Sequence, residues 1–452
     1  MDLRGARDAL PAQRLLLRER VVSAIRDVPF YARLYRPFGP PPEDLDDFMA
    51  WFGTLPVISR TDFEDVADGE RVSRAYADVS LVRKQTSGST GIPFVLYIDE
   101  RVASFRSWRF RKPHLASGES APDTLEFLFP ERFRRDRQVR VVANQTGDAP
   151  PPPEGVRRTR TEKSYSTLTD ALKAPEAIYA NLKARRPRTL TGYASSIVGL
   201  AAFMVAEDRR LPSVQRIWTT SEMLTPEGRE AIRTAFGFEA REAYASVEFG
   251  FMGWQAEPGG AYTLETDRLV FEGVSLASGR AAAPGEDSRV VISDLLNDAT
   301  PLLRYEIGDI AVMDAPMDFS AACYGAIAAL RGKTNDSIRD AAGRRIEPFA
   351  LLGHLKETLG AAQYRLICVE PGLFVLQYRP ARTAEVRIEA ALDGLRRIVG
   401  EPARVVAQRV PRIERETSGK LRPIIDLSSV TGAGRERLLT DLHLEDILNV
   451  TA

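Results

Sequence analysis

The sequence is poor in the residues that usually mark metal centres and disulfide scaffolds. It has 2 cysteines and 3 histidines in 452 residues. Cys323 and Cys368 lie in apolar surroundings, which predicts buried core thiols and not a disulfide scaffold. His114, His354 and His443 lack the spacing of metal ligands. A structural zinc site is therefore not expected.

An excess of one charge and long apolar runs are also missing. The 62 Lys and Arg residues balance 62 Asp and Glu residues, for a formal net charge of +0. Dedicated nucleic-acid binders usually carry a strong basic excess, so we expect no nucleic-acid partner. No segment approaches the roughly 20 apolar residues that cross a bilayer, and residues 1–10 lack the apolar run of a signal peptide. We therefore expect no membrane partner and a cytoplasmic location.

The periodicity that is present indicates a layered α/β protein with two parts. Hydrophobic residues make up 44% of the chain, which is enough for a sizeable core. Helix and strand patterns alternate over residues 175–236, as in an α/β layered domain. From about residue 331 onward, a shorter series of strand and helix patterns has the size of a separate small domain.

A loop of small residues between two predicted strands, within residues 80–99, is the most informative stretch. Its members are Thr86, Ser87, Gly88, Ser89, Thr90 and Gly91. Two glycines let the backbone approach an anion, and hydroxyl and N–H groups can surround phosphate oxygens. The loop is neither a Walker A motif, which ends in Gly-Lys-Ser/Thr, nor a Gly-x-Ser-x-Gly elbow. It predicts a phosphate site, with an ordinary turn as the alternative.

This loop resembles the phosphate loop of the adenylate-forming superfamily, most closely in its phenylacetate-CoA ligase and CapK-like branch. Segments 28–31, 55–60 and 190–195 are similar to further signatures of that branch, and their order makes the match specific. The resemblance covers nearly the whole chain. It implies a large N-terminal ATP- and acid-binding domain, residues 1–332, and a small, mobile α+β C-terminal domain, residues 333–452.

Two segments match the family's adenine and metal positions. Ser221 and Glu222 follow an apolar strand and match the segment that lines the adenine pocket; part of a helix N-cap is the alternative. Tyr244 and Glu248 match the family's Tyr-Gly-x-x-Glu motif, with Ala245 where Gly is common. By resemblance, Tyr244 would stack on adenine and Glu248 would help to hold Mg²⁺, which prefers carboxylate oxygens.

Residues 301–309 closely resemble the family's Arg-Tyr-x-x-Gly-Asp motif, and this resemblance implies a ribose contact. Asp309 would accept hydrogen bonds from both ribose hydroxyls, as a carboxylate can. The alternative is that Gly308 and Asp309 simply form a hairpin turn.

Residues 331–336 lie where the family has Gly-Arg-x-Asp-Asp, the hinge between its domains. Lys333 replaces the Arg and Asn335 replaces the first Asp. Lysine is a point charge without the fork geometry of arginine, so whether Lys333 or Arg331 contacts ribose or phosphate stays open. Asn335 tolerates unusual backbone angles, which keeps a hinge at this position plausible.

Residues 415–422 resemble the loop that carries the family's catalytic lysine. Lysine is scarce in this chain, with 8 Lys against 54 Arg, which argues against Lys420 being an ordinary surface residue without a role. It would neutralise the charge that grows on the α-phosphate and carboxylate oxygens in the transition state. The phosphate loop departs from the family in having no lysine at Ile92 or Phe94. Mg²⁺, backbone amides and a nearby arginine would then compensate the pyrophosphate charge.

The resemblance implies a two-step reaction. A small carboxylic acid attacks the α-phosphorus of ATP to give an acyl-adenylate and pyrophosphate, and a thiol or amine then displaces AMP. CoA is the first choice of acceptor, with the thiol of an acyl carrier protein or an amine as the alternative. Tyr193, Ser195 and Phe249, and with less support Phe129, are pocket candidates for the acid, and aromatic walls suit an aryl acid. A non-catalytic nucleotide-binding scaffold is the alternative of another class, and the sequence does not indicate an oligomeric state.

Overall fold

A computed structural model gives the architecture of most of the chain. It describes residues 4–63, 66–85, 94–109, 125–129, 140–142, 166–170, 174–276, 278–317, 323–333, 338–340, 345–346, 351, 354–355, 358–380, 386–411, 413, 423–428, 430 and 433–444. The predicted phosphate loop, residues 86–91, lies outside these residues, as do Ile92, Asn335 and Lys420. For Phe129 and Lys333 the backbone alone is described.

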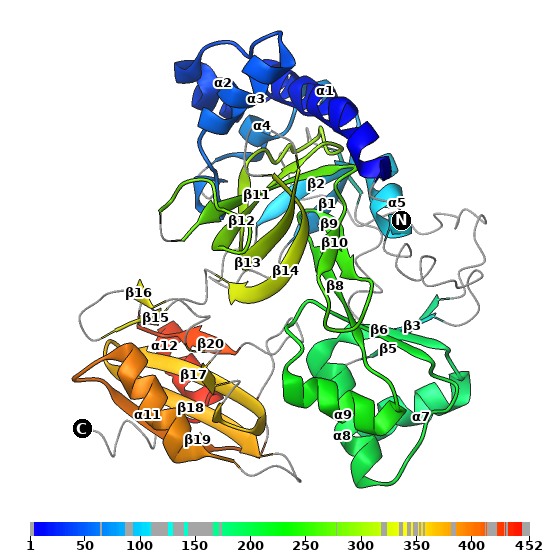
Figure 1. Cartoon of the computed structure of the whole chain (residues 1–452), viewed down its shortest axis with the longest axis vertical. Helices are drawn as coiled ribbons and strands as arrows, with labels where there is room; N and C mark the ends of the chain where they lie inside the picture. The colour runs from blue at the N-terminus through cyan, green and yellow to red at the C-terminus, as the bar shows by residue number, and fades with distance from the viewer. Residues whose placement is uncertain are drawn as a thin grey trace.

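Helices near the N-terminus cover one end of the molecule (top of Figure 1). One helix ends at Asp27 and the next begins at Pro29, whose missing N–H is harmless at that position. The elements are α1 (Arg4–Asp27), α2 (Pro29–Tyr35), α3 (Leu45–Thr54) and α4 (Asp68–Arg71), with the short 3-10 helices η1 (Arg36–Phe38), η2 (Arg60–Phe63) and η3 (Arg74–Tyr76).

The predicted strand–loop–strand at residues 80–99 is confirmed as an antiparallel pair. β1 (Ser80–Gln85) pairs with β2 (Val95–Asp99) on one side and with β4 (Arg140–Val142) on the other. α5 (Glu100–Arg109) follows β2 directly. The residues between β1 and β2 are those of the predicted phosphate loop.

The large sheet has eleven strands in the order β11-β12-β13-β14-β10-β9-β8-β7-β6-β3-β5. The strands from β8 to β5 pair in parallel, and the others pair antiparallel. Their bounds are β3 (Leu125–Phe129), β5 (Ser166–Asp170), β6 (Thr189–Tyr193), β7 (Arg216–Thr220), β8 (Arg241–Ser246), β9 (Gly250–Gln255), β10 (Tyr262–Leu264), β11 (Leu269–Ser275), β12 (Asp287–Asp294), β13 (Tyr305–Met317) and β14 (Cys323–Lys333).

Three helices pack on one face of the parallel half: α7 (Pro175–Arg185), α8 (Ala194–Ala206) and α9 (Pro226–Phe236). The buried side chains of Leu190 and Ile217 face this layer. The N-cap of α9, Thr225, accepts a hydrogen bond from the Gly228 N–H at 3.0 Å, and Gly237 ends the helix in the left-handed region at φ 82°.

The C-terminal part forms its own sheet, β19-β18-β17-β20, with its own hydrophobic core. The predicted combination of a large layered domain and a small α+β domain is therefore confirmed, while the boundary at residues 332 and 333 stays a prediction. The elements are β15 (Ile338–Arg339), β16 (Arg345–Ile346), β17 (Ala361–Glu370), β18 (Leu373–Pro380), α11 (Ile388–Val399), β19 (Arg404–Arg409), β20 (Ile424–Asp426) and α12 (Ala433–Asp441).

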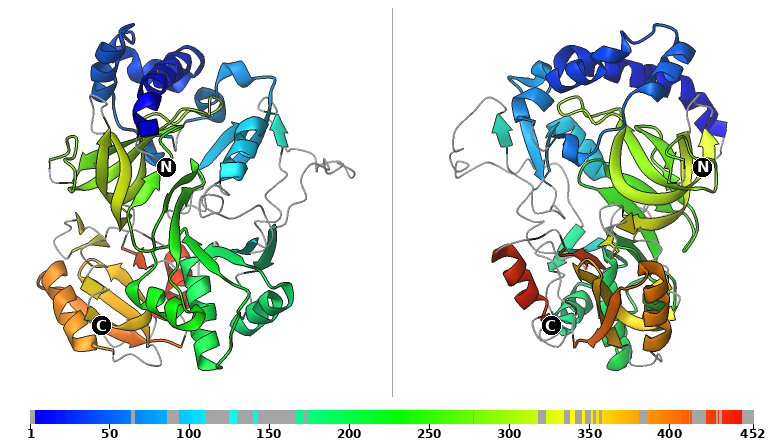
Figure 2. Two further views of the ribbon diagram at one scale, coloured as in Figure 1. Left: turned by 45° about the vertical axis from the view of Figure 1, so that its right-hand side comes forward. Right: turned by 90° about the vertical axis from the view of Figure 1, so that its left-hand side faces the viewer.

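The small domain lies beside the helices of the parallel half, with β17 in contact with α9 (Figures 1 and 2). Tyr364 on β17 is 8% exposed, and burial and the nearby carboxylate of Glu227 on α9 raise the pKa of its hydroxyl. Cys323 and Cys368 are both buried free thiols, as predicted. No helix in the described part of the chain combines the length and apolar character that crossing a bilayer requires.

Candidate functional site

A buried hydrogen bond joins two of the predicted nucleotide-binding residues. The Tyr244 hydroxyl, near the end of β8, donates to Asp309 Oδ2 on β13 at 2.7 Å. The two residues are 6% and 8% exposed. Burial, followed by the charge of Asp309, raises the pKa of the Tyr244 hydroxyl, so it remains a protonated donor at neutral pH.

A bulge in β13 positions Asp309. Arg289 of β12 pairs with Ile310 and Val291 pairs with Glu306, so β13 has more residues than β12 between these two pairs. Gly308 lies inside the bulge at φ 83°, a left-handed conformation that a side chain would disfavour. The alternative of a hairpin turn at Gly308 and Asp309 is therefore wrong, because the chain continues as β13 to Met317.

The start of the predicted hinge lies next to Asp309. Lys333, the last residue of β14, is the cross-strand partner of Asp309. Arg331, the other cation considered for this role, donates from Nε to Asp287 Oδ1 at 3.1 Å and is 47% exposed. The backbone of Lys333 thus lies opposite Asp309, whereas the Arg331 side chain pairs with Asp287.

Glu248, in the turn between β8 and β9, belongs to the same cluster. After burial, its charge is the largest cause that raises the pKa of the Tyr305 hydroxyl, and it contributes to the raised pKa of Tyr244. Its carboxylate therefore lies close to both rings. No group of three metal-ligating side chains occurs among the described residues, but Mg²⁺ is commonly held by one or two carboxylates together with substrate phosphates. Glu248 fits that pattern.

The segment predicted to line the adenine pocket leaves β7 beside Tyr244. Thr220 pairs with Ala243, so Ser221 and Tyr244 follow at the same edge of the sheet. Ser221 has φ 69°, a left-handed conformation unusual for a residue other than glycine and common at functional sites. Glu222 Oε2 accepts a hydrogen bond from the Ser195 N–H at 2.8 Å, which links the ends of β7 and β6. Thr225 is the N-cap of α9, so the N-cap alternative does not apply to Ser221 or Glu222.

Several solved structures of enzymes have a similar fold. No protein-family model matches the chain, and no curated protein matches it. Among solved structures, 2-hydroxyisobutyryl-CoA ligase in the postadenylation state, in complex with 2-HIB-AMP, has a TM-score of 0.66 at 17% identity and covers 96% of this chain and 92% of its own. ATP-bound MatB from Rhodopseudomonas palustris has a TM-score of 0.51 at 13% identity, over 82% of this chain and 69% of its own.

A third neighbour, the anthranilate CoA ligase AuaEII in complex with anthranoyl-AMP, has a TM-score of 0.52 at 12% identity, over 87% of this chain and 71% of its own. The chain has the fold of adenylate-forming CoA ligases. The two-domain architecture expected from the sequence is thereby confirmed by independent structures.

The residues predicted to bind the acid lie at or below the same edge. Tyr193 ends β6, is 1% exposed and pairs with Thr220, and Ser195 follows it in the first turn of α8. Phe249 is fully buried, and its ring meets Tyr305 edge-on at 5.9 Å between centroids. The Phe249 ring thus belongs to the core beneath the site, and its role in acid binding stays a prediction.

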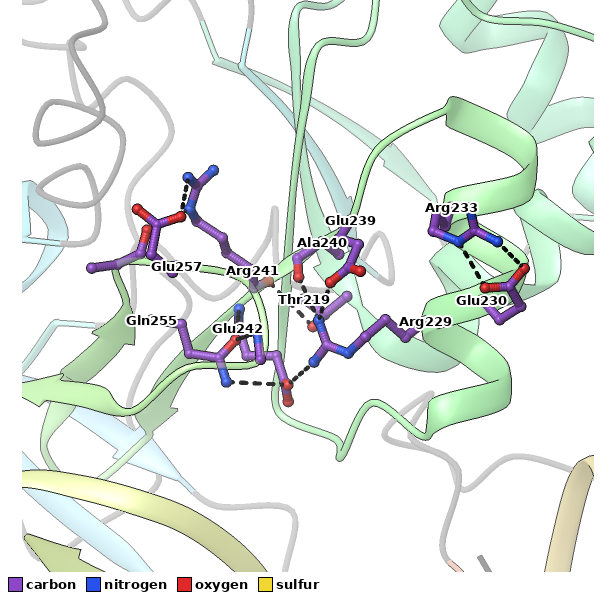
Figure 3. A network of polar contacts seen from close by, with 12 residues as sticks. Thr219, Arg229, Glu230, Arg233, Glu239, Ala240, Arg241, Glu242, Gln255 and Glu257 are labelled. Carbon is purple, nitrogen blue, oxygen red and sulfur yellow. Dashed lines mark hydrogen bonds and ion pairs between the residues drawn. The ribbon is translucent and has the colours of Figure 1, made fainter.

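Sequence reasoning missed a polar network that holds β8 in place (Figure 3). Arg229 on α9 donates to Glu242 Oε1 at 2.6 Å and to the Ala240 carbonyl at 2.8 Å, and Gln255 donates to the same carboxylate at 3.4 Å. Glu242 precedes Tyr244 by two residues on β8. The Arg229–Glu242 pair therefore positions the strand that carries Tyr244, and no local sequence signal identifies it because the partners lie on different elements.

Proposed function

We propose that this protein uses ATP to convert a carboxylic acid to an acyl-adenylate, and then transfers the acyl group to a thiol, with CoA as the first choice. This proposal depends on the buried Tyr244–Asp309 hydrogen bond, with Lys333 opposite Asp309 and Glu248 near enough to influence Tyr244. These residues come from segments far apart in the chain. Their convergence supports a single nucleotide site at this edge of the sheet.

In this proposal Asp309 binds the ribose. A carboxylate can accept hydrogen bonds from two ribose hydroxyls at once, and the Tyr244 hydroxyl, which donates to Asp309 Oδ2, orients this carboxylate. Ser221 and Glu222 lie at the adenine side and residues 86–91 at the phosphates. Lys333 would add a positive charge near the ribose, and Glu248 would ligate Mg²⁺. When bound, Mg²⁺ supplies charge neutralisation of the phosphates.

The first reaction step forms an acyl-adenylate. An oxygen of the substrate carboxylate attacks the α-phosphorus, the bond from that phosphorus to the bridging oxygen breaks, and pyrophosphate leaves with the electron pair. Lys420 of the C-terminal domain would neutralise the negative charge that develops on the oxygens. The large domain, residues 1–332, would hold both substrates in position for this step.

The second step transfers the acyl group. A thiolate attacks the acyl carbon of the mixed anhydride, and AMP leaves with the bonding electron pair. Movement of residues 333–452 about Asn335 would keep water out between the steps and admit the thiol. The similar structures of CoA ligases, among them complexes with acyl-AMP and CoA, favour CoA over a carrier protein or an amine.

The acid is proposed to bind beside Tyr193 and Ser195, with Phe249 in the wall, and an aryl acid suits these aromatic residues. ATP–pyrophosphate exchange with aryl, short hydroxy, fatty and amino acids tests the first step. Mass analysis of products with CoA, a carrier protein or an amine tests the second step. We expect exchange with one acid class and an acyl-CoA product. Binding of ATP without exchange for any acid would favour the scaffold alternative instead.

A further inference from the structure

Arg60 ends the signature segment 55–60, for which the sequence predicts no role at the site, and it lies against the candidate site. Arg60 begins η2, and the preceding Ile58 forms a parallel bridge with Tyr305 at the start of β13. The Glu306 N–H donates to the Ile58 carbonyl at 2.7 Å, and the Ile58 N–H donates to the Arg304 carbonyl at 2.9 Å. These backbone bonds fix the position from which the Arg60 side chain extends.

The local turn around Arg60 is also fixed. The Asp62 carboxylate accepts hydrogen bonds from the Ser59 N–H at 2.7 Å and from the Ser59 hydroxyl at 2.8 Å. Ser59 directly precedes η2, and the carboxylate three residues later is the acceptor for its N–H. Arg60 is therefore presented by a rigid turn.

The Arg60 guanidinium and the Glu248 carboxylate both act on the Tyr305 hydroxyl. Burial and Glu248 raise the pKa of Tyr305, and Arg60 is the largest influence that lowers it. The other charged group that acts on this hydroxyl is Glu306, on the strand itself. Arg60 and Glu248 are thus both within electrostatic reach of Tyr305.

Aromatic rings connect Arg60 to the end of the phosphate loop. Phe94 follows the loop residues directly and stacks on Tyr305 at 5.9 Å between centroids. Phe63, in the same 3-10 turn as Arg60, lies 5.7 Å from Phe94 and 6.5 Å from Tyr305. The turn that carries Arg60 therefore packs where the chain leaves the loop.

The Nη2 atom of Arg60 is buried and has no hydrogen-bond partner within the described part of the chain. A buried donor without an acceptor is unfavourable and calls for an explanation. The neighbouring arginines differ. Arg71 lies over the Phe94 ring at 5.7 Å but donates from Nε to Asp68 at 3.0 Å, and Arg304 has several acceptors.

We propose that Arg60 binds the β- and γ-phosphates of ATP, and hence the pyrophosphate leaving group, in place of the loop lysine that is absent at Ile92 and Phe94. This inference rests on the proposed function. A guanidinium suits the task because it donates two parallel hydrogen bonds to a phosphate and keeps its charge at all relevant pH values. As the α–β phosphoanhydride bond breaks, the electron pair moves to an oxygen of pyrophosphate, and Arg60 stabilises that charge.

Binding of ATP, AMP and inorganic pyrophosphate, each with Mg²⁺, to the full-length protein and its Arg60→Ala and Arg60→Lys variants tests this assignment. A lost charged hydrogen bond predicts about 10- to 100-fold weaker binding of ATP and pyrophosphate in Arg60→Ala. AMP affinity should stay within about twofold because AMP lacks these phosphates, and Arg60→Lys should restore part of the loss. Arg33→Ala is the control, since Arg33 is 62% exposed and pairs with exposed Glu70.

The outcomes separate the inference from the proposed function. If the unaltered protein binds ATP and Arg60→Ala retains its pyrophosphate affinity, the assignment of Arg60 is wrong and the proposed function stands. Equal losses of AMP and pyrophosphate binding would show a structural role and would also overturn it. If the unaltered protein binds no ATP, both fail. Should Arg60→Ala not fold, Arg60→Gln is measured in the same way, because it keeps most of the side-chain volume.

Discussion

Arg304 and Arg60 lie on neighbouring segments at the start of β13, yet their surroundings differ in kind. Arg304 is 8% exposed, and it contacts Glu272 with Nη2–Oε1 at 3.0 Å and Nε–Oε2 at 3.2 Å. It also donates to the carbonyls of Gly53, at 2.8 Å, and Leu55. Arg60 has a buried N–H group without an acceptor among the described residues. The many fixed partners of Arg304 indicate that it stabilises the fold, whereas the unfilled donor of Arg60 is the group that we propose to bind phosphate.

Arg304→Ala should produce the largest effect, on stability. It leaves the buried Glu272 carboxylate, whose pKa burial already raises, without its cation. Loss of one partner of a buried ion pair typically lowers the free energy of unfolding by about 3–5 kcal/mol. Denaturant unfolding measures this change. Arg60→Ala in the same assay should lose much less, and a comparable loss in both variants would break the distinction between the two arginines.

Lys420→Ala should act on chemistry and leave stability unchanged. A preorganised donor that meets charge only in the transition state is typically worth about 10²–10³-fold in rate. Single-turnover formation of the acyl-adenylate measures this loss, while ATP affinity and unfolding should match those of the unaltered protein. Lys183→Ala, an exposed change on α7, is the control. Unchanged adenylation in Lys420→Ala would remove this residue from the mechanism.

The sequence predicted the fold where local signals and long-range packing agree. The helix at 226–236 has a Thr N-cap, Pro at its first position and Gly after its end, so its bounds follow from capping preferences alone. Local sequence patterns likewise predict the strand–loop–strand at residues 80–99. Tyr244, Glu248 and Asp309 were found through the motif resemblance, and the structure brings them together.

What the sequence could not decide depends on contacts between distant segments. Gly308 with a positive φ is compatible with a hairpin turn or a bulge, and the pairing of β13 with β12 decides between them. The surroundings of Arg60 depend on the β-bridge between Ile58 and Tyr305, and no local sequence pattern predicts this bridge. The Arg229–Glu242 pair is hidden for the same reason.

Asp309→Ala should affect binding at the ribose end of the nucleotide, whereas Arg60→Ala should affect binding at the phosphate end. Loss of the ribose acceptor should weaken ATP and AMP binding alike, by about 10- to 100-fold for charged hydrogen bonds. Pyrophosphate binding should not change, because pyrophosphate lacks a ribose. Tyr244→Phe is the matched variant, since it removes only the donor to Asp309, and we expect a smaller loss. If Asp309→Ala weakens pyrophosphate binding as strongly as AMP binding, Asp309 does not act on the ribose alone, and the comparison with Arg60 fails.

The smallest expected effect concerns two arginines of α9 that lie away from the nucleotide site and differ in their ion-pair partners (Figure 3). Arg229 is 20% exposed and holds Glu242 of β8, whereas Arg233 is 56% exposed and pairs with Glu230 one turn earlier. Water screens exposed ion pairs and they contribute little, so Arg233→Ala should change neither stability nor ATP affinity measurably.

Arg229→Ala should weaken ATP binding about fivefold, roughly 1 kcal/mol, because β8 and with it Tyr244 lose a fixed position. Titration with ATP, AMP and pyrophosphate measures this change in both variants. A positioning role predicts that the loss is partly restored in Arg229→Lys and is larger for AMP than for pyrophosphate, since Tyr244 acts at the ribose end. If the Arg229 and Arg233 variants bind ATP equally well, the Arg229–Glu242 contact does not affect the nucleotide site. The number of hydrogen-bond partners alone would then not identify a positioning residue.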